Sequence, residues 1–442
     1  MNGWRAVGTA LAGLLLATAG VPSPAALAGP SSPPATPVPT GAAATATPAG
    51  TAAPAFVACG TIPPTTPVPA RPSPPPHPAG LSTVGGPGLD TAGLALPTGA
   101  SPLPPLSATS WLVADLDTGA VLGACGPHQA SPPASVQKLL LVDTLVTKLD
   151  PAQVVEIVPD DLNIERGSSA VGLVIGGHYP VETLWLGLLL ESGNDAANTL
   201  ARVGGGAAGV PGTVAAMNTE AERLGAFDTH AVTPSGLDGP GQFTSVYDLA
   251  LIAREDFTKE PFRRYTTSQS AQIPAQPPKD PRGFQIQNEN KLLTRYPGAI
   301  GGKTGFTELA RHTYVGAAAR NGHRLVVTIL AAELHPQPAW QQGAALLDWG
   351  FAQPAGASVG HLVSPAEADQ LRHPPVPTSA PTGNGPVLAA GGPATGRSVT
   401  LLDTIGLVVA ALALPLVALA VLNARRRAAK RRGRRRVPAG RR

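Results

Sequence analysis

Two long stretches rich in Pro, Ala, Thr, Gly and Ser limit the part of this chain that can form a packed domain. They cover residues 29–105 and 354–399, carry almost no charge and show no apolar periodicity, so the sequence predicts extended, disordered linkers there. Residues 106–353 differ, because they combine alternating and helical apolar patterns with most of the aromatic side chains. About 250 residues are enough to bury a hydrophobic core, and we expect one domain in this segment.

The N-terminus has the pattern of an export signal. Arg5 precedes a short apolar stretch, and Ala26-Leu27-Ala28 fits a small-residue cleavage site. A buried core helix fits less well, because a Pro-rich tract follows at once. We expect residues 1–28 to be a signal peptide and the mature chain to begin near Gly29.

The C-terminus has the pattern of a membrane anchor. Within the predicted transmembrane helix at 401–422, the stretch 404–422 contains no charge and is long enough to cross a bilayer. The tail at 423–442 carries 11 Lys and Arg residues, and the positive-inside rule keeps such a tail in the cytoplasm. These features predict a single-pass type I protein of the cell membrane, with its domain on the cell-wall side.

The charge of the chain changes sign when this tail is set apart. The formal net charge is +4, but removing the 11 basic residues of the tail from the total of 32 leaves 21 against 28 Asp and Glu, a charge of −7. A mildly acidic domain argues against a nucleic-acid partner. We interpret the basic tail as a stop-transfer and lipid-headgroup signal.

The sequence contains two cysteines, Cys59 and Cys125. An exported chain meets an oxidising compartment, where two cysteines can form a disulfide. Such a bond would join the N-terminal arm to the domain, and two free thiols remain the alternative. Lipidation of Cys59 is excluded because this residue lies far beyond the apolar core of the signal.

Two hairpins and a series of helices organise residues 106–353. Turn signals at Asp117-Thr118-Gly119 and at Asn321-Gly322 each separate two apolar strands. Helical patterns fill the sequence between them, and Thr244 or Ser245 can cap one of these helices. Strands at both ends predict an α+β fold, in which distant segments complete one antiparallel sheet, helices flank it, and a mainly helical lobe is inserted.

The stretch ASVQKLLL, residues 134–141, places a serine and a lysine at the start of an apolar helix. A spacing of three puts Ser135 and Lys138 on one helical face, with the serine at the positive end of the helix dipole. A hydroxyl becomes a good nucleophile once a base removes its proton, and a desolvated lysine can be that base. The alternative is a helix N-cap followed by a lysine that reaches to solvent.

Two further motifs follow in order along the chain. Ser192-Gly193-Asn194 interrupts two helical patterns, and Lys303-Thr304-Gly305 lies where the chain enters a strand. Each motif alone fits an ordinary loop or turn. Together with the Ser-x-x-Lys stretch, they form a combination that is typical of penicillin-binding proteins and class A β-lactamases.

On these residues the chain resembles the low-molecular-mass penicillin-binding proteins, in particular the serine D-alanyl-D-alanine carboxypeptidases. Segments that look like this family occur in the same order between about residue 108 and residue 353: PPASVQKL, GLLLESGNDAANTLA, PSGLDGPGQFTSVYDLALIAR, NENKLLTRYPGAIGGKTGFT and LLDWGFA. The resemblance implies a β-lactamase/transpeptidase-like fold. It also implies a DD-carboxypeptidase that removes the terminal D-alanine from peptidoglycan stem pentapeptides, binds β-lactam antibiotics covalently, and needs no metal or other cofactor.

The resemblance further implies catalytic roles for residues of the first two motifs. Ser135 would attack the carbonyl of the penultimate D-alanine and form an acyl-enzyme, which water then hydrolyses. Lys138 would act as the base for acylation. Ser192 would relay a proton to the leaving amine, and Asn194 would hold the substrate amide and orient Lys138.

Substrate binding would fall to the third motif. Lys303 would supply positive potential, Thr304 would hydrogen-bond the terminal carboxylate, and Gly305 would let the strand approach closely. The N–H groups of Ser135 and Phe306 would form the oxyanion hole. Some family members have an arginine after the following strand, where this chain has AAELHPQPAW. Arg311 is a candidate substitute, although we favour an ordinary exposed arginine there.

Other functions are disfavoured or stay open. A class A β-lactamase usually needs a further glutamate on a loop that no segment resembles, and an inactive wall scaffold or sensor would not need every catalytic side chain. A DD-endopeptidase uses the same acyl-enzyme and stays open. Four carboxylates are explained by solvated loops and helix termini without a glycosidase function: Asp160, Asp161, Glu191 and Asp195. Three histidines lack the spacing of metal ligands: His128, His178 and His230.

Overall fold

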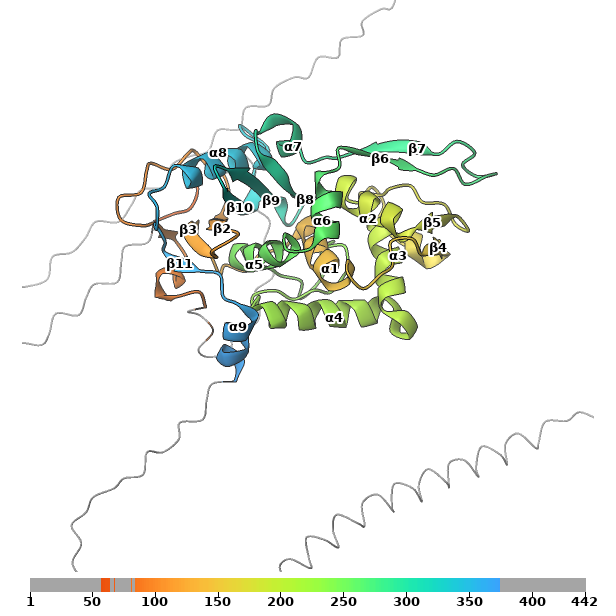
Figure 1. Ribbon diagram of the computed structural model, residues 1–442, viewed down its shortest axis with the longest axis horizontal. Coiled ribbons are helices and arrows are strands. Elements are labelled where there is room, and N and C mark those ends of the chain that lie inside the picture. Colours follow the sequence, from red (N-terminus) through yellow and green to blue (C-terminus); the bar gives the residue numbers. More distant parts are fainter. Residues whose placement is uncertain (1–56, 64–66, 68–80, 82–83, 374–442) are drawn as a thin grey trace, which may run out of the picture. The chain divides into compact units, whose positions relative to one another are not determined.

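The computed structural model describes residues 57–63, 67, 81 and 84–373 (Figure 1). The predicted signal peptide at 1–28, the transmembrane helix at 401–422 and the basic tail lie outside the described residues. Within the described part of the chain, no helix has both the length and the apolar character that crossing a bilayer requires.

One antiparallel sheet forms the centre of the domain. Its strands lie in the order β1-β3-β2-β10-β9-β8, and β11 pairs with β3 beside β1. Val113 pairs with Val327, so that strands from the two ends of the domain lie side by side as predicted. The strands are β1 (Leu94–Ala95), β2 (Ser110–Asp115), β3 (Ala120–Cys125), β8 (Ala299–Thr307), β9 (Arg311–Arg320), β10 (His323–Ala332) and β11 (Gly360–His361).

Both predicted hairpin turns are confirmed. Asp115 ends β2 and its carboxylate accepts the N–H groups of Asp117 and Thr118, which fixes the turn into β3. Asn321 and Gly322 connect β9 to β10, and both have the positive φ that a tight two-residue hairpin requires. These local signals are strong because the turn residues alone decide the backbone conformation.

Helices cover both faces of the sheet. Side chains alternate between the faces, and Val113 and Val327 pack with Trp349 of α8 (Ala339–Phe351) on one of them. On the other face the sheet packs on α5 (Val246–Asp256), which in turn packs on α1 (Lys138–Leu145). Ser245 caps α5 by accepting the N–H of Asp248, which confirms the second of the two predicted caps.

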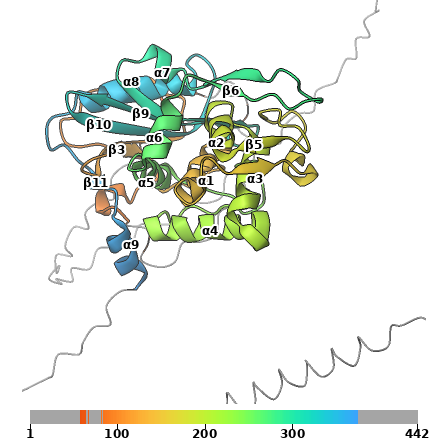
Figure 2. The ribbon, with the colours of Figure 1, turned by 45° about the vertical axis from the view of Figure 1, so that its right-hand side comes forward.

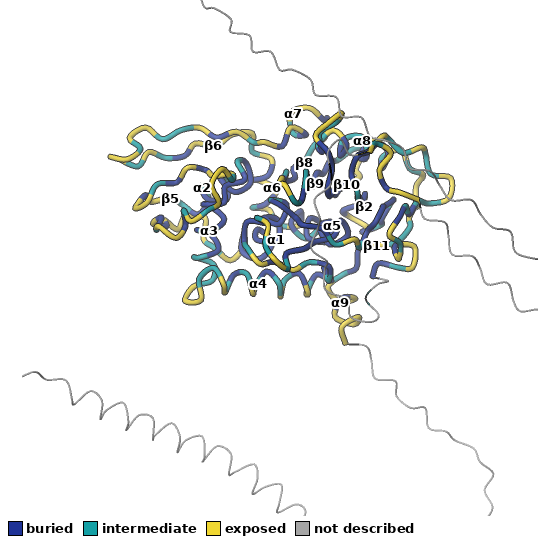
Figure 3. Tube along the Cα trace, turned by 180° about the vertical axis from the view of Figure 1, so that it is seen from behind, coloured by how far each residue is buried: buried dark blue, intermediate teal, exposed yellow. Residues whose placement is uncertain are grey.

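The inserted lobe is mainly helical, as predicted, and lies beside the sheet (Figures 1 and 2). It also contains two small hairpins that the sequence patterns did not indicate, and the tip of one of them is exposed in Figure 3. The elements from η2 to α7 are η2 (Ala134–Gln137), α1, β4 (Val154–Glu156), η3 (Pro159–Leu162), β5 (His178–Pro180), α2 (Val181–Leu190), α3 (Asn194–Gly204), η4 (Gly206–Ala208), α4 (Gly209–Leu224), α5, α6 (Glu260–Thr267), β6 (Ser270–Ile273), β7 (Phe284–Gln287) and α7 (Leu292–Arg295).

The prediction that the arms are disordered throughout 29–105 and 354–399 was wrong for the parts nearest the domain. Residues 84–105 contain η1 (Pro87–Leu89) and β1, and Leu89 is fully buried. Residues 354–372 contain β11 and α9 (Pro365–Arg372), with Leu362 buried between them. Single apolar side chains anchor these segments at the edge of the sheet, and isolated anchors leave no periodicity in a sequence.

A disulfide joins Cys59 to Cys125, the last residue of β3. Of the two alternatives for these cysteines, the structure therefore has the bonded one. The N–H groups of Thr61 and Ile62 both donate to the carbonyl of Leu106. These contacts place the start of the described arm against the body of the domain.

Candidate active site

Ser135 and Lys138 lie where the polypeptide enters α1. Ser135 is in the 3-10 turn η2 rather than in the first turn of α1, and the preceding Ala134 has a positive φ. The predicted contact is present, because Lys138 Nζ lies 2.8 Å from Ser135 Oγ. Lys138 is fully buried, which excludes the alternative of a lysine that reaches to solvent.

Two further groups hold the amine of Lys138. Nζ donates to Asn194 Oδ1 at 2.7 Å and to the backbone carbonyl of Ser235 at 2.8 Å. Burial lowers the pKa of Lys138 well below its usual value, and the charge of Lys303 lowers this pKa further. A neutral amine has two N–H donors and one lone pair. Because the carbonyl and the amide oxygen can only accept, the lone pair of the neutral amine points to the Ser135 hydroxyl.

The second motif lies between α2 and α3, as predicted. Ser192 is buried with φ 61°, and its Oγ has no hydrogen-bond partner among the described residues. Asn194 begins α3 and projects its side chain to Lys138. A hydroxyl without a partner in an accessible cleft is free to bond a ligand.

The third motif forms the middle of β8. Lys303 is buried, its Nζ donates to the carbonyl of Thr304 at 2.8 Å, and burial lowers its pKa to about 8 against the opposing charge of Glu289. A methyl group placed on Gly305 would lie 2.8 Å from the backbone nitrogen of Ser135. Only glycine therefore lets β8 approach the serine this closely. Phe306 follows and is 49% exposed.

A cleft of about 510 Å³ joins the three motifs. It brings together most of the predicted site residues, and Lys138 and Lys303 are buried against it rather than lining it. Its walls include Ser135, Ser192, Asn194, Thr304, Gly305 and Phe306, together with Ser169, Leu237, Glu289, Lys291, Thr307, His312, Leu334, Pro338 and Trp340.

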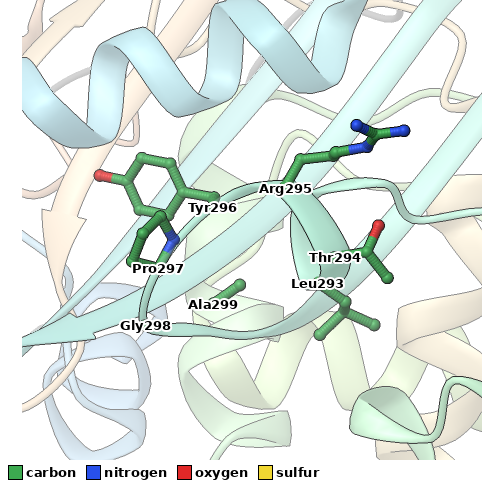
Figure 4. A pocket seen from close by; sticks show the side chains of 7 residues that line it. All are labelled: Leu293, Thr294, Arg295, Tyr296, Pro297, Gly298 and Ala299. Carbon is green, nitrogen blue, oxygen red and sulfur yellow. The ribbon is translucent and has the colours of Figure 1, made fainter.

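A second hollow lies at the turn between α7 and β8 (Figure 4). The polar side chains of Arg295 and Tyr296 point in opposite directions in this view and so do not converge. The Tyr296 hydroxyl is already bonded to Asp348. No residue of the three motifs lines this hollow, and we place the chemistry in the cleft at Ser135.

Arg311, the candidate substitute for the missing arginine, does not line the cleft, and the favoured interpretation of an ordinary exposed arginine was wrong, because its side chain is only 14% exposed. Its guanidinium donates to the carbonyl of Pro67 at 2.9 Å and lies 3.9 Å from the carboxylate of Glu333. The lysines on or against the sheet side of the cleft are instead Lys303 and Lys291, and burial lowers the pKa of His312 on the same walls.

The carboxylates that the sequence singled out make structural contacts. Asp195 accepts the N–H groups of Val171, Gly172 and Leu173, and so fixes the loop beside Asn194. Asp161 is buried and paired with Arg202, not in a solvated loop as predicted.

Sequence reasoning missed Glu289 as a group of the cleft. It lies three residues before the start of α7 and is exposed to the cleft. The only signal was its place between Asn288 and Asn290, a pattern that is too short to interpret alone.

Among the described residues, one group of side chains is close enough to share a metal ion: His128, Asp228 and Asp248. His128 Nδ1 faces Asp228 Oδ2 at 2.9 Å, and its Nε2 faces the carbonyl of Val84 at 3.0 Å. Both ring nitrogens of His128 therefore already face oxygen atoms of the protein. We interpret the group as a clamp that holds residue 84 on the domain.

The fold and the site define a class of protein. An antiparallel sheet with a helical lobe, and a serine whose hydroxyl faces a desolvated lysine, are the parts of a serine acyl-transfer enzyme with a transpeptidase-like fold. The chain belongs to the peptidase S11 family, the D-alanyl-D-alanine carboxypeptidases, whose family model matches residues 98–333. The resemblance found in the sequence is thereby confirmed.

Relatives with known sequences and structures agree with this assignment. The chain is 47% identical over 261 residues to D-alanyl-D-alanine carboxypeptidase DacB2 of Mycobacterium tuberculosis, covering 58% of this chain and 86% of that one. It is 34% identical to DacD of Escherichia coli over 55% of this chain and 63% of that one. A crystal structure of a D-alanyl-D-alanine carboxypeptidase from M. tuberculosis matches with 45% identity and a TM-score of 0.56, over 60% of this chain and 99% of that one. The Streptomyces K15 DD-transpeptidase matches with 27% identity and a TM-score of 0.55, over 57% of this chain and 100% of that one.

Proposed function

We propose that this chain is a serine D-alanyl-D-alanine carboxypeptidase. It removes the terminal D-alanine from peptidoglycan stem pentapeptides through an acyl-enzyme, and β-lactam antibiotics acylate the same serine. The observation that carries this proposal is the geometry at Lys138, whose two acceptors leave the lone pair of the neutral amine directed at Ser135 Oγ. Membership of the S11 family supports the choice of substrate.

Acylation follows from these contacts. Lys138 takes the proton of the Ser135 hydroxyl as Oγ attacks the carbonyl carbon of the penultimate D-alanine. The amide N–H of Ser135 faces β8 at Gly305, beside Phe306, and the N–H groups of Ser135 and Phe306 stabilise the oxyanion. Lys138 then returns the proton to the leaving amine through the Ser192 hydroxyl. The bond to the terminal D-alanine breaks, and water hydrolyses the ester in a second step.

The terminal carboxylate binds at the sheet side of the cleft. Lys303 supplies a positive charge behind Thr304, and the Thr304 hydroxyl donates to the carboxylate. Thr307 lies further along β8 on the same wall, with its hydroxyl bonded to Asp238. Arg311 takes no part in this proposal, because it contacts Pro67 outside the cleft.

The first experiment is intact-mass analysis of the full-length protein with a labelled penicillin, for the wild type and for Ser135→Ala. D-alanine release from diacetyl-Lys-D-Ala-D-Ala is measured in parallel. We expect one adduct per chain in the wild type, none in Ser135→Ala, and release by the wild type only. An adduct without release favours an endopeptidase or a sensor, and the lack of any adduct contradicts the assignment of Ser135.

A carboxypeptidase that acts on peptidoglycan works on the cell-wall side. We further propose that the chain reaches this side by an N-terminal signal at 1–28 and stays there through a type I anchor at 401–422. The uncharged stretch 404–422 and the basic tail support the anchor. Membrane fractionation of the full chain and of a chain truncated after residue 400 is the test. If both distribute alike, the anchor is excluded.

A further inference from the structure

Glu289 is a charged group of the cleft that the proposed reaction does not use. It lies between β7 and α7, and its carboxylate shares the cleft with Ser135 and Thr304. The Thr304 side chain opposes the rise in the pKa of this carboxyl group. An acidic side chain in a cleft that must bind a carboxylate repels the substrate, so its presence there needs a reason.

The backbone around Glu289 is fixed on both sides. The Asn288 side chain donates to the carbonyls of Thr266 and Ser268. Asn290 is buried, and its Oδ1 accepts from the Tyr314 hydroxyl. These bonds leave Glu289 as the one side chain of the Asn-Glu-Asn triplet that lines the cleft.

A third contact links Glu289 to the second motif. Its N–H donates to the carbonyl of Leu190, the last residue of α2 and the second residue before Ser192. The backbone of Glu289 is thus held by three separate elements of the domain, which sets where its side chain enters the cleft.

The charge of Glu289 acts on both lysines of the site. Lys138 and Lys303 are both buried, and burial lowers the pKa of each, with the charge of Lys303 lowering that of Lys138 further. Glu289 opposes this effect by raising both pKa values. The protein around Glu289 removes part of its hydration and raises its own pKa, against the charge of Lys303.

We propose that Glu289 is a positioning residue for the proposed reaction, whose carboxylate, in the same cleft as Thr304, holds Lys303 in its charged form for the terminal carboxylate of the substrate. This inference rests on the proposed function. The carboxylate does not touch the reacting atoms and acts through the two lysines. Its repulsion of the substrate is offset because it stabilises the positive charge that attracts the substrate.

The direction of the expected effect follows from the two lysines. Lys138 must lose a proton before it can accept one from Ser135, so it sets the acidic limb of the pH profile. Lys303 must keep its proton to attract a carboxylate, so it sets the basic limb. Removing the negative charge of Glu289 lets both lysines release their protons at lower pH, and both limbs move to lower pH together. A purely structural role would scale the whole curve without moving either limb.

The experiment is the pH profile of kcat/KM for D-alanine release by the full-length protein. We expect Glu289→Gln to shift both limbs to lower pH by about one unit or less, and Glu289→Asp, which keeps the charge, to restore them. Glu191→Gln is the matched control, because this neighbouring carboxylate raises the pKa of Glu289 but is not among the groups that shift the pKa of either lysine.

The other titratable groups around the site stay in place in every variant, so the comparison isolates Glu289: Asp195 beside Lys138, and Lys291 and His312 on the cleft walls. If the two limbs of the pH profile of Glu289→Gln coincide with those of the wild type, the inference is wrong. Limbs of Glu191→Gln that shift equally also overturn it, because the effect would then be unspecific.

A second readout separates this inference from the proposed function. The rate of penicillin acylation of Ser135 is measured over the same pH range, because a β-lactam also carries a carboxylate and needs the same two lysines. If the wild type is acylated but releases no D-alanine, the carboxypeptidase proposal fails and the acylation profiles decide the role of Glu289. If the wild type is not acylated at all, both proposals fail. Thermal unfolding of each variant shows whether it is folded.

Discussion

Lys138 and Lys303 are both almost completely buried, but their amines are bonded in different ways. Lys138 belongs to the helical side of the cleft, and its Nζ has three partners, of which two can only accept. Lys303 belongs to the sheet, and among the described residues its Nζ has one acceptor, the carbonyl of the next residue. Two of its three N–H donors therefore stay available. In the proposed mechanism, the site therefore uses the same type of side chain once as a base and once as a cation.

The surroundings explain why the two roles do not exchange. Burial lowers the pKa of Lys138, and the charge of Lys303 lowers it further. Burial lowers the pKa of Lys303 only to about 8, because Glu289 opposes the effect. A charged Lys303 thus favours a neutral Lys138, so the two lysines hold different protonation states near neutral pH.

The largest effect is expected when the base is removed. Lys138→Met keeps the volume of the buried chain but removes the amine, and we expect penicillin acylation to fall by about 10³-fold or more. The melting temperature should stay constant or rise, because a buried amine is costly to desolvate. Stopped-flow acylation and thermal unfolding provide the measurements.

Lys148→Met is the control for this substitution, since Lys148 is exposed at the end of the same helical segment. We expect no change in the acylation rate. A Lys138→Met variant that is acylated at the rate of the wild type would show that another group takes the proton, and the contrast between the two lysines would disappear.

A smaller loss is expected when one acceptor of Lys138 is removed. Asn194→Ala deletes the oxygen that fixes the amine at 2.7 Å, and the lone pair then no longer has a single direction. We expect acylation to slow by about 10²-fold. Asn198→Ala is the matched control, because Asn198 lies one turn further along α3 and its side chain bonds to the carbonyl of Asp161. Equal losses in both variants would point to a general disturbance of α3.

The pH dependence of KM for the peptide tests the proposed role of Lys303 as the cation of the site. Lys303 loses its charge as the pH rises through about 8, so we expect KM for the peptide to rise above this pH. Lys303→Met should have a KM that is roughly 10-fold to 100-fold higher at pH 7 and that no longer rises at this pH. A wild-type KM that stays constant up to pH 10 would contradict the role of Lys303.

The stability of the folded protein should increase over the pH range in which Lys303 loses its charge and substrate binding weakens. The pKa of Lys303 is about 8 in the folded state and 10.5 for an unperturbed lysine, so the unfolded chain binds more protons between these two pH values. The contribution of this group to the free energy of unfolding therefore increases from pH 8 toward pH 10.5. Urea unfolding of the wild type and of Lys303→Met, compared at each pH, isolates this contribution.

Local signals in the sequence predicted the parts of the site that are close together along the chain. The spacing of three gave the contact of Ser135 with Lys138, and the turn residues gave the two hairpins of the sheet. The family pattern placed the three motifs around one cleft. The match to the S11 family and the solved structures confirm the fold that this pattern implied.

Tertiary contacts decide what the sequence did not show. The third partner of Lys138 is a backbone carbonyl at Ser235, which has no side-chain signature. Glu289 enters the cleft because asparagines on both sides are bonded to other elements. The arms fold onto the domain through single anchors such as Leu89, which binary patterning does not register. In each case the deciding partner is distant along the chain.

The smallest effect concerns the arginine that the sequence offered as a carboxylate ligand. Arg311→Ala removes a guanidinium that bonds to the carbonyl of Pro67 and does not line the cleft. We expect KM for the peptide to stay within about threefold of the wild type, or ~0.7 kcal/mol. Arg320→Ala at the other end of β9, where the guanidinium bonds to Asp348, is the control. A rise in KM of about tenfold or more for Arg311→Ala alone, present with a free C-terminus and absent with an amidated one, would assign the carboxylate to Arg311. Lys303 would then lose its distinct role as the cation of the site.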